Sequence, residues 1–393
     1  MSELQVVVES WLPASVAQGR LKVRPQTLYA YVSRGLVEAR PDPDDPRRSL
    51  YRAADIETLS RRKARGRRAA AIATEAIAWG EPVLPSAVST VSKGRLFYRG
   101  KDAATLAETA TLEETAALLW DAGAMLAPVS ASACEGPMKA RLFTVIAAEA
   151  AEDPPMAGRA ETLLQRDGAR VLAALAASVS GRGGEEPAHL RIARAWRADA
   201  DLVRRALVLL ADHELNASAF AARVAASTGA SLSACVLAGL ATLSGPRHGA
   251  HYLRVQAFLG KVETLGAQKA ARARLDQGVE IPGFGHPLYP DGDIRAQALL
   301  SRLRLCALED DTVAAVRAAT GAAPNIDFAL CALTRAAVLP TEAPFALFAA
   351  GRCAGWIAHA LEQNGAGALI RPRARYVGPD PVSGQGAQAD ASR

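Results

Sequence analysis

The stretch IPGFGHPLYPDGDIRA, residues 281–296, places a histidine directly behind a turn that contains two glycines. Glycine readily adopts backbone conformations that other residues avoid, so Gly283 and Gly285 allow the chain to turn sharply just before His286. Four of the six histidines lie between residues 213 and 286, a concentration that an even spread would not give. These features together predict a functional site in this part of the chain.

The composition is that of a folded protein with more than one domain. The 393 residues exceed what one hydrophobic core usually supports, and 50% of them are apolar. The longest apolar stretch, residues 230–243, is too short to span a membrane and predicts a buried helix. The N-terminus lacks the pattern of a signal peptide, and the five cysteines form no CxxC pair. We therefore expect a cytoplasmic protein without disulfides or a membrane partner.

The net charge of +6 is concentrated near the N-terminus. Residues 20–68 contain fourteen Lys or Arg against six Asp or Glu, whereas residues 69–393 sum to zero. Charge segregated in this way is typical of a segment that faces nucleic acid. We expect a head at residues 1–62, a basic linker at 63–74 and a flexible tail at 379–393.

The head has the predicted element order of a winged helix-turn-helix domain. Residues 23–37 predict a helix from Pro25 to Gly35, followed by a Pro/Asp turn, an extended RSLYR and a helix from Ala54 or Asp55. The wording TLYAYVSRGLVEAR and RRSLYRAADIETL resembles the DNA-binding head of MerR-type regulators. The resemblance implies two kinds of DNA contact. Bases in the major groove would be contacted by Gln26, Thr27, Tyr29 and Arg34. Phosphates would be contacted by Arg47, Arg48 and Arg52. A helical docking module with solvated arginines is the alternative.

The body, residues 75–378, is predicted to be mainly α-helical. Alanine and leucine dominate it, and residues 86–100 are the patch that predicts strands. Residues 110–123 predict an amphipathic helix capped at Thr111. We expect the glycine-rich GRGGEEPA segment to be a flexible loop and His189, directly after it, to belong to that loop.

The clustered histidines do not form a familiar metal motif. HELNA lacks the second histidine of HExxH, and His248 and His251 have no carboxylate beside them in the sequence. The sequence contains neither a GxGxxG nor a GxxxxGK[ST] loop. We therefore expect no metal site and no nucleotide-phosphate cradle.

Six motifs in order resemble the citrate synthase family, and the resemblance extends from about Ile77 to Gly378. They are ADHELNAS (211–218), SGPRHGA (244–250), GFGHPLYPDGDIRA (283–296), NIDFALCAL (325–333), GRCAGWIAHALEQ (351–363) and RPRARYVG (371–378). The resemblance implies a mainly α, two-domain helical body with a large domain and a small domain inserted at about 250–340. The small winged helix-turn-helix domain would precede this body.

The resemblance also implies a reaction. The protein would be an acyltransferase that condenses acetyl-CoA or propionyl-CoA with oxaloacetate, giving citrate or 2-methylcitrate and CoA, with no cofactor beyond acyl-CoA as a substrate. Asp327 would be the base for the α-carbon, since a carboxylate in an apolar setting has a raised pKa. His248 would donate a hydrogen bond to the thioester oxygen, and His286 would polarise the ketone of oxaloacetate.

Further residues would bind the substrate. His213 would hydrogen-bond oxaloacetate, and Arg295, Arg352 and Arg371 would hold carboxylates by bidentate pairing, which lysine does less well. In the family Arg371 would reach the neighbouring subunit's site, which implies a homodimer. We expect His359 to be structural.

The chain also departs from the family pattern. Ala250 and His251 follow the GPRHG motif where a glycine and an alanine are usual, Pro287 follows His286, and Ile294 replaces a proline. These changes affect the expected cleft wall near acyl-CoA, and ordinary members lack a DNA-binding-like head. The alternative function is a DNA-binding regulator whose synthase-like body senses acyl-CoA or oxaloacetate. Retention of the expected base Asp327 favours the enzyme.

Overall fold

The structure is a computed structural model that describes residues 11–33, 36–43, 45–60, 84–123, 136–374 and 376–378. The predicted linker and tail, together with Arg34 and Cys134, lie outside the described residues. The chain divides into two compact units, Met1–Pro85 and Ser86–Arg393.

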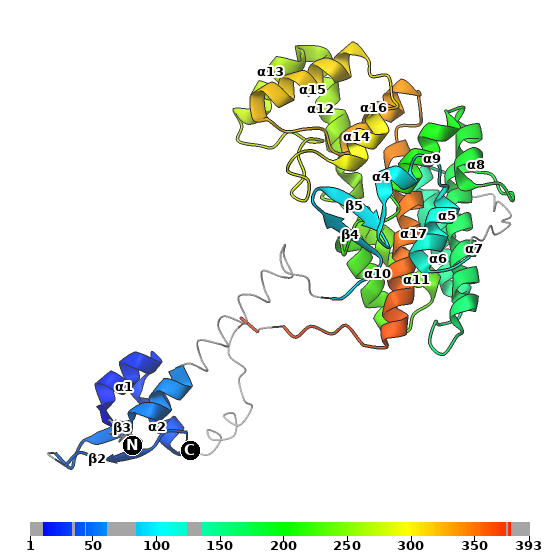
Figure 1. Cartoon of the computed structure of the whole chain (residues 1–393). Helices are drawn as coiled ribbons and strands as arrows, with labels where there is room; N and C mark the ends of the chain where they lie inside the picture. Colours follow the sequence, from blue (N-terminus) through cyan, green and yellow to red (C-terminus); the bar gives the residue numbers. More distant parts are fainter. Residues whose placement is uncertain are drawn as a thin grey trace, which may run out of the picture. The chain divides into compact units, whose positions relative to one another are not determined.

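The N-terminal unit combines helices with a three-stranded antiparallel sheet of order β1-β3-β2 (Figure 1). Its strands and helices are β1 (Trp11–Pro13), α1 (Ala14–Leu21), α2 (Pro25–Ser33), β2 (Ala39–Pro41) and β3 (Ser49–Arg52). Residues 53–60 are helical as well. Leu28 of α2 and Tyr51 of β3 are buried in a small apolar core of this unit. A helix and an extended segment thus form where the sequence predicted them, and the assignment of a winged helix-turn-helix domain stays a prediction.

The second unit is mainly helical, with a small antiparallel sheet of order β4-β5-β6. The strands are β4 (Ser89–Ser92), β5 (Arg95–Tyr98) and β6 (Lys101–Asp102). The first helices are α4 (Ala103–Leu106), α5 (Leu112–Trp120), α6 (Met138–Glu152), α7 (Glu161–Ser180), α8 (Ala188–Trp196), α9 (Ala200–Leu209), α10 (Ala217–Ser227) and α11 (Leu232–Leu243). The 3-10 turn η1 (Gly249–His251) and the helices α12 (Tyr252–Leu265), α13 (Ala267–Leu275), α14 (Ile294–Leu300), α15 (Ala307–Thr320), α16 (Ile326–Ala336) and α17 (Ala343–Ala366) follow.

Helix α17 is the centre of the main core. It is 24 residues long, is buried along most of its length and packs against α5, α7, α9, α10 and α11 (Figure 1). A helix that is apolar on nearly every face is stable in water when other helices cover it on all sides. The loops at the ends of these neighbouring helices therefore have a rigid support.

Local sequence signals explain several helix ends. The Thr111 side chain accepts a hydrogen bond from the Glu114 N–H, and the Glu114 side chain accepts one from the Thr111 N–H, which is the capping box expected from the sequence. The expectation for His189 was wrong, because α8 begins at Ala188 and buries this histidine. Pro187 at the N-cap starts the helix directly after the glycine-rich segment.

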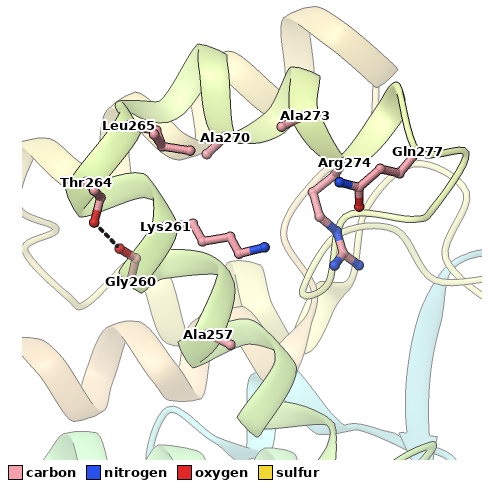
Figure 2. Close-up of a pocket in the computed structure, with 9 residues that line it drawn as sticks. All are labelled: Ala257, Gly260, Lys261, Thr264, Leu265, Ala270, Ala273, Arg274 and Gln277. Atoms are coloured by element: carbon pink, nitrogen blue, oxygen red, sulfur yellow. Dashed lines mark hydrogen bonds between the residues drawn. The ribbon is translucent and has the colours of Figure 1, made fainter.

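A second apolar cluster lies among α12, α13 and α15, in the segment for which the sequence predicted a small domain (Figure 1). A shallow cavity of about 340 Å³ opens between α12 and α13. The side chains of Lys261 and Arg274 point into it from the two helices (Figure 2). None of the described helices combines the length and apolarity needed to cross a bilayer.

Candidate active site

The turn before His286 is fastened to the chain in front of α16. Gly283 and Gly285 have φ angles of 87° and 72°, in the left-handed region that favours glycine. The Gly285 N–H donates to the Ala323 carbonyl at 2.8 Å, and the Asn325 N–H donates to the Gly283 carbonyl at 2.9 Å. The Asn325 side-chain amide also donates to the Gly285 carbonyl at 3.0 Å. The turn and the start of α16 therefore form one rigid piece.

The ring of His286 is held in a defined protonation state. Its Nδ1 accepts a hydrogen bond from the Leu288 N–H at 3.2 Å. Burial, and then the nearby positive charge of Arg295, lower the pKa of His286 to about 4. The ring is therefore neutral at physiological pH and carries its proton on Nε2, which can donate to a ligand.

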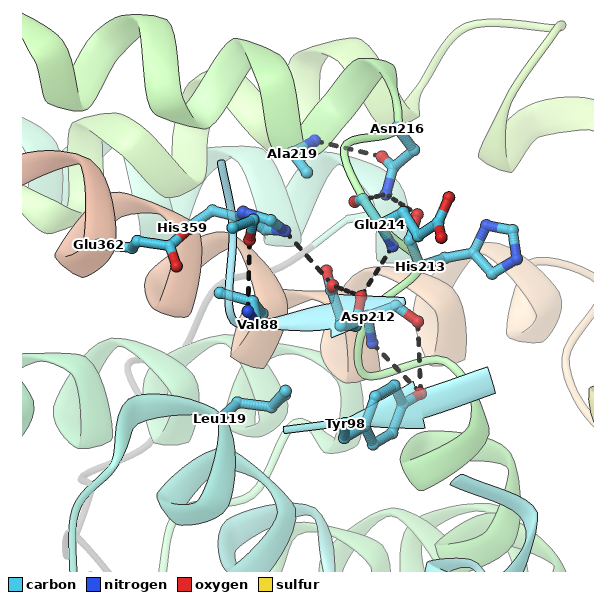
Figure 3. A network of polar contacts seen from close by, with 12 residues as sticks. Val88, Tyr98, Leu119, Asp212, His213, Glu214, Asn216, Ala219, His359 and Glu362 are labelled. Carbon is cyan, nitrogen blue, oxygen red and sulfur yellow. Dashed lines mark hydrogen bonds and ion pairs between the residues drawn. The ribbon is translucent and has the colours of Figure 1, made fainter. Parts of the chain in front are cut away.

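His213 lies on the loop between α9 and α10, and Ser89 of β4 holds this loop on both sides of it. The Ser89 hydroxyl donates to the Asp212 carboxylate at 2.5 Å and accepts from the Glu214 N–H at 2.8 Å. The Asn216 side chain donates to the His213 carbonyl at 3.1 Å. These bonds hold the loop in place on both sides of His213 (Figure 3).

Asp212 is a fully buried carboxylate on the same loop. His359 of α17, which is also fully buried, donates from Nε2 to Oδ2 of Asp212 at 3.3 Å, the same oxygen that the Ser89 hydroxyl binds (Figure 3). Burial raises the pKa of Asp212, but the hydrogen bond and charge of His359, together with Arg352, keep the pKa below its ordinary value. Asp212 is thus ionised and anchors the loop to α17, which gives His359 the structural role expected of it.

Gly355 allows this loop to lie directly on α17. Its N–H donates to the Ala211 carbonyl at 2.9 Å. A Cβ at this position would lie 2.3 Å from Oδ1 of Asp212 and 2.5 Å from the Ala211 carbonyl oxygen. Both distances are shorter than real carbon contacts, so the close approach requires glycine.

Two buried arginines have different partners. Arg295 is paired with Asp293 through Nε at 2.9 Å and Nη2 at 2.8 Å. Arg352 donates from Nε to the Leu210 carbonyl at 2.8 Å, whereas its buried Nη2 has no hydrogen-bond partner among the described residues. Burial lowers the pKa of Arg352 to about 10, so the side chain is still a cation at neutral pH. A buried cation with an unsatisfied donor is suited to bind an anionic ligand.

Asp327 is the second residue of α16 and lies close to Arg295 and Asp293. Burial is the main cause that raises the pKa of Asp327, to about 7, with Arg295 opposing the rise and Asp293 adding to it. Its backbone N–H is bound by the Asn325 side chain at 3.1 Å, while its carboxylate has no hydrogen-bond partner in the described part of the chain. Such a carboxylate can exchange a proton near neutral pH.

His248 completes the cluster. Its Nε2 lies 2.8 Å from the Ser218 hydroxyl, and its ring meets Phe348 edge to face at 5.7 Å between centroids. Burial, followed by the charges of Arg352 and Arg295, lowers the pKa of His248 to about 3. This ring is neutral as well. Because the charges of both arginines act on the pKa of His248, this ring lies in the same site as Arg295 and Arg352.

The structure thus brings together six of the seven predicted substrate-site residues. The pKa of His213 is lowered by burial and then by Arg295, Arg352, His286 and His248, which shows how closely these groups surround it. Arg371 is exposed on the segment after α17 and forms no hydrogen bond or ion pair with the rest of the described chain. The cavity between α12 and α13 contains none of these residues.

The residues predicted to contact DNA lie in the first unit. Gln26 and Tyr29 are exposed on α2, and Thr27 is partly buried. Arg47 is exposed, while Arg48 pairs with Asp45 and Arg52 with Glu38, both at 3.2 Å. Arg34 lies outside the described residues.

Several functional side chains escaped the sequence reasoning. Tyr289 hydrogen-bonds His213, Asp293 pairs with Arg295, and Ser89 and Asp212 hold the His213 loop. Tyr289 and Asp293 lie inside the quoted 281–296 stretch, so only their role was missed, whereas nothing in the sequence near Ser89 indicates its partner. Within the described ranges, no three His, Cys, Asp or Glu residues are grouped so that they could hold a metal ion.

Comparison with known proteins agrees with this geometry. Residues 188–373 match the family model described as citrate synthase, C-terminal domain. Putative citrate synthase 2 from Mycobacterium bovis is 36% identical over 215 residues, which are 51% of this chain and 55% of the relative. A 2-methylcitrate synthase from Shewanella oneidensis is 33% identical over 186 residues, 44% of this chain and 50% of the relative. The chain thus spans about half the length of these curated relatives.

Solved structures extend the fold beyond that region. Citrate synthase from Thermotoga maritima aligns with a TM-score of 0.63 at 24% identity, covering 77% of this chain and 96% of that chain. A ternary complex of carboxymethyl coenzyme A and oxaloacetate with citrate synthase from Thermoplasma acidophilum aligns with a TM-score of 0.62 at 22% identity, covering 77% and 95%. The mainly helical fold implied by the sequence motifs is therefore confirmed as citrate synthase-like.

Proposed function

We propose that this protein is an acyltransferase that condenses acetyl-CoA or propionyl-CoA with oxaloacetate in the cytoplasm, releasing citrate or 2-methylcitrate and CoA. One observation carries the proposal: Asp327, a carboxylate with a raised pKa and no hydrogen-bond partner among the described residues, shares a site with neutral histidines and buried arginines. A base, hydrogen-bond donors and cations are the groups that this condensation needs. The complex of a similar synthase with oxaloacetate and a CoA analogue supports the two substrates.

The substrate oxaloacetate has two carboxylates and a ketone. Arg352, whose Nη2 is unpartnered in the described chain, and Arg295 hold the carboxylates, and His213 adds a hydrogen bond. The Nε2–H of His286 donates to the ketone oxygen and makes the ketone carbon more electrophilic. The neutral state of both histidines lets them donate without repelling the arginines.

The acyl-CoA is activated by removal of an α-proton. Asp327 takes this proton, and the thioester oxygen acquires negative charge as the enolate forms. The Ser218 hydroxyl has one proton and two partners, Oδ1 of Asn216 at 2.7 Å and Nε2 of His248 at 2.8 Å. When the proton is donated to Nε2 of His248, the ring proton resides on Nδ1 and can stabilise the thioester oxygen. The enolate carbon then bonds to the ketone carbon, and hydrolysis of the thioester by water releases CoA. No cofactor is needed for these steps.

The test is CoA release by the purified full-length protein. Free thiol should appear with oxaloacetate and acetyl-CoA or propionyl-CoA, and not when oxaloacetate is omitted. The ratio of kcat/KM for the two acyl-CoA substrates then decides between citrate and 2-methylcitrate. Asp327→Asn, which is nearly isosteric but cannot accept the proton, should lose turnover by a factor of about 10³ or more while still binding oxaloacetate. Absence of thiol release with either acyl-CoA would refute the proposal.

We also propose that two chains form a homodimer in which Arg371 completes the neighbouring chain's site. In the described structure Arg371 is exposed and has no partner within its own chain. Arg371 of one chain would then bind a substrate carboxylate in the site of the other chain.

A second proposed function is DNA binding by the N-terminal unit. The excess of eight positive charges between residues 20 and 68 favours it, and so does the exposure of Gln26 and Tyr29 on α2. The full-length protein should bind duplex DNA at low salt, with affinity that falls steeply as salt rises. Loss of binding in a chain lacking residues 1–68, with condensation retained, would agree with a separate head. No binding even at low salt would favour the docking module.

A further inference from the structure

Asp293 is the most completely bound carboxylate of the site. It is buried, and its side chain accepts four hydrogen bonds. Oδ1 accepts from the Arg295 backbone N–H at 3.0 Å and from Nε of Arg295 at 2.9 Å. Oδ2 accepts from Nη2 of Arg295 at 2.8 Å and from the Ile326 N–H at 3.0 Å. One side chain therefore contacts the guanidinium and the first residue of α16.

The position of Ile326 gives this contact its significance. Ile326 is the first residue of α16, and the proposed base Asp327 is the second. The first N–H groups of a helix have no partner within the helix and need one from elsewhere. Asp293 supplies it, so the substrate-binding arginine and the helix that carries the base share one carboxylate.

We propose that Asp293 is a positioning residue that couples the grip of Arg295 on oxaloacetate to the placement and basicity of Asp327. This inference rests on the proposed condensation and extends it. Asp293 keeps the guanidinium plane fixed before the substrate arrives and holds the first turn of α16 against it. A shift of Arg295 upon binding a carboxylate is then transmitted to the base through a single side chain.

The charges around Asp327 define what Asp293 does electrostatically. On α14, Arg295 favours the ionised form of Asp327, and at the N-cap of that helix Asp293 disfavours it. On α16 itself, Asp327 lies near the thiol of Cys331, whose pKa is raised by burial and then by the charge of Asp327. The other titratable neighbours of Asp293 are His286 on the adjoining turn, whose ring is neutral, and Tyr289, whose pKa is raised by burial so that its hydroxyl keeps its proton. Without the charge of Asp293, Arg295 would act on Asp327 unopposed and make it a weaker base.

The experiment compares Asp293→Asn with the unsubstituted protein over a range of pH. Asparagine keeps the shape but removes the charge and one acceptor. We expect KM for oxaloacetate to rise about tenfold and the acid limb of kcat to move to lower pH by about one unit, with a lower plateau. Asp291→Asn, the same change at an exposed residue two positions away, should alter neither. Reduced kcat with an unmoved acid limb would show a merely structural role and overturn the proposal.

A second variant tests the link to α16 without removing the charge. Proline at the first position of a helix is tolerated, and the extended backbone of Asn325 permits it, so Ile326→Pro removes the N–H that Asp293 binds. We expect kcat to fall at least tenfold with KM for oxaloacetate little changed. Unchanged kcat would overturn the coupling, even if Asp293→Asn fails to fold.

A failure of the proposed reaction can be distinguished from a failure of the proposed role of Asp293. If the unsubstituted protein releases no thiol, the proposed reaction is wrong. Arg295 is then judged by the oxaloacetate concentration that protects against thermal unfolding, which Asp293→Asn should raise about tenfold. Equal protection of both proteins would overturn the role of Asp293 in positioning Arg295.

Discussion

The hydroxyl of Tyr289 lies 2.9 Å from Nε2 of His213 and joins two parts of the site that come from distant segments. Burial raises the pKa of Tyr289, so its hydroxyl keeps its proton. The described residues offer this hydroxyl no other acceptor, and it therefore donates to Nε2. The proton of the neutral His213 ring then resides on Nδ1.

Tyr289→Phe should weaken oxaloacetate binding. The substitution keeps the buried ring but removes the bond that selects the tautomer of His213, so part of the population presents the wrong nitrogen. We expect KM for oxaloacetate to rise about tenfold with kcat changed less. Steady-state kinetics at saturating acyl-CoA would measure both. Tyr376→Phe, at an exposed tyrosine, is the control and should behave like the unsubstituted protein.

Turnover should depend on the ionisation of Asp327. A base must be deprotonated to act, and burial raises the pKa of this carboxylate to about 7. The value of kcat should therefore rise with pH through about 7 and fall tenfold for each unit below it. A rate profile measured from about pH 5 to 9 tests this. A flat profile down to pH 5 would mean that Asp327 has an ordinary pKa or is not the base.

The same raised pKa predicts a pH-dependent cost in stability. A carboxyl group whose pKa is higher in the folded than in the unfolded chain destabilises the fold when it is ionised. The cost is absent below the unfolded value of 3.8 and complete above about 7. Asp327→Asn should thus raise the melting temperature at pH 8 and have little effect near pH 4. Equal effects at both pH values would contradict the linkage.

Gly355→Ala should be far more harmful than a methyl group elsewhere on the same helix. The new Cβ would collide with Asp212 and the Ala211 carbonyl, both part of a rigid loop. We expect a loss of about 3 kcal/mol in the free energy of unfolding, together with weaker oxaloacetate binding because His213 moves. Gly365→Ala, where nothing lies within 4 Å, should instead stabilise α17 by about 0.5–1 kcal/mol. Urea denaturation of the two variants makes the comparison.

The sequence predicted the site residues that carry recognisable chemistry and missed those that hold them. The capped helix after Thr111 and the turn around Gly283 follow from local rules, and the structure contains both. The contact between Ser89 and Asp212 joins residues 123 positions apart, and that between Asp212 and His359 spans 147. Only tertiary packing brings such groups together. His189 shows the same limit, since packing and not the neighbouring glycines decides that it is buried.

The shared site of the proposed dimer can be tested by mixing two inactive chains. One chain carries Asp327→Ala and the other Arg371→Ala. If Arg371 completes the neighbouring site, each mixed dimer has one site in which both residues are intact. Random co-refolding makes about half of the dimers mixed, so about a quarter of the unsubstituted activity should return. Each variant refolded alone is the control. Activity that stays at the single-variant level, although mixed dimers are shown to form, would mean that Arg371 serves its own chain or no site.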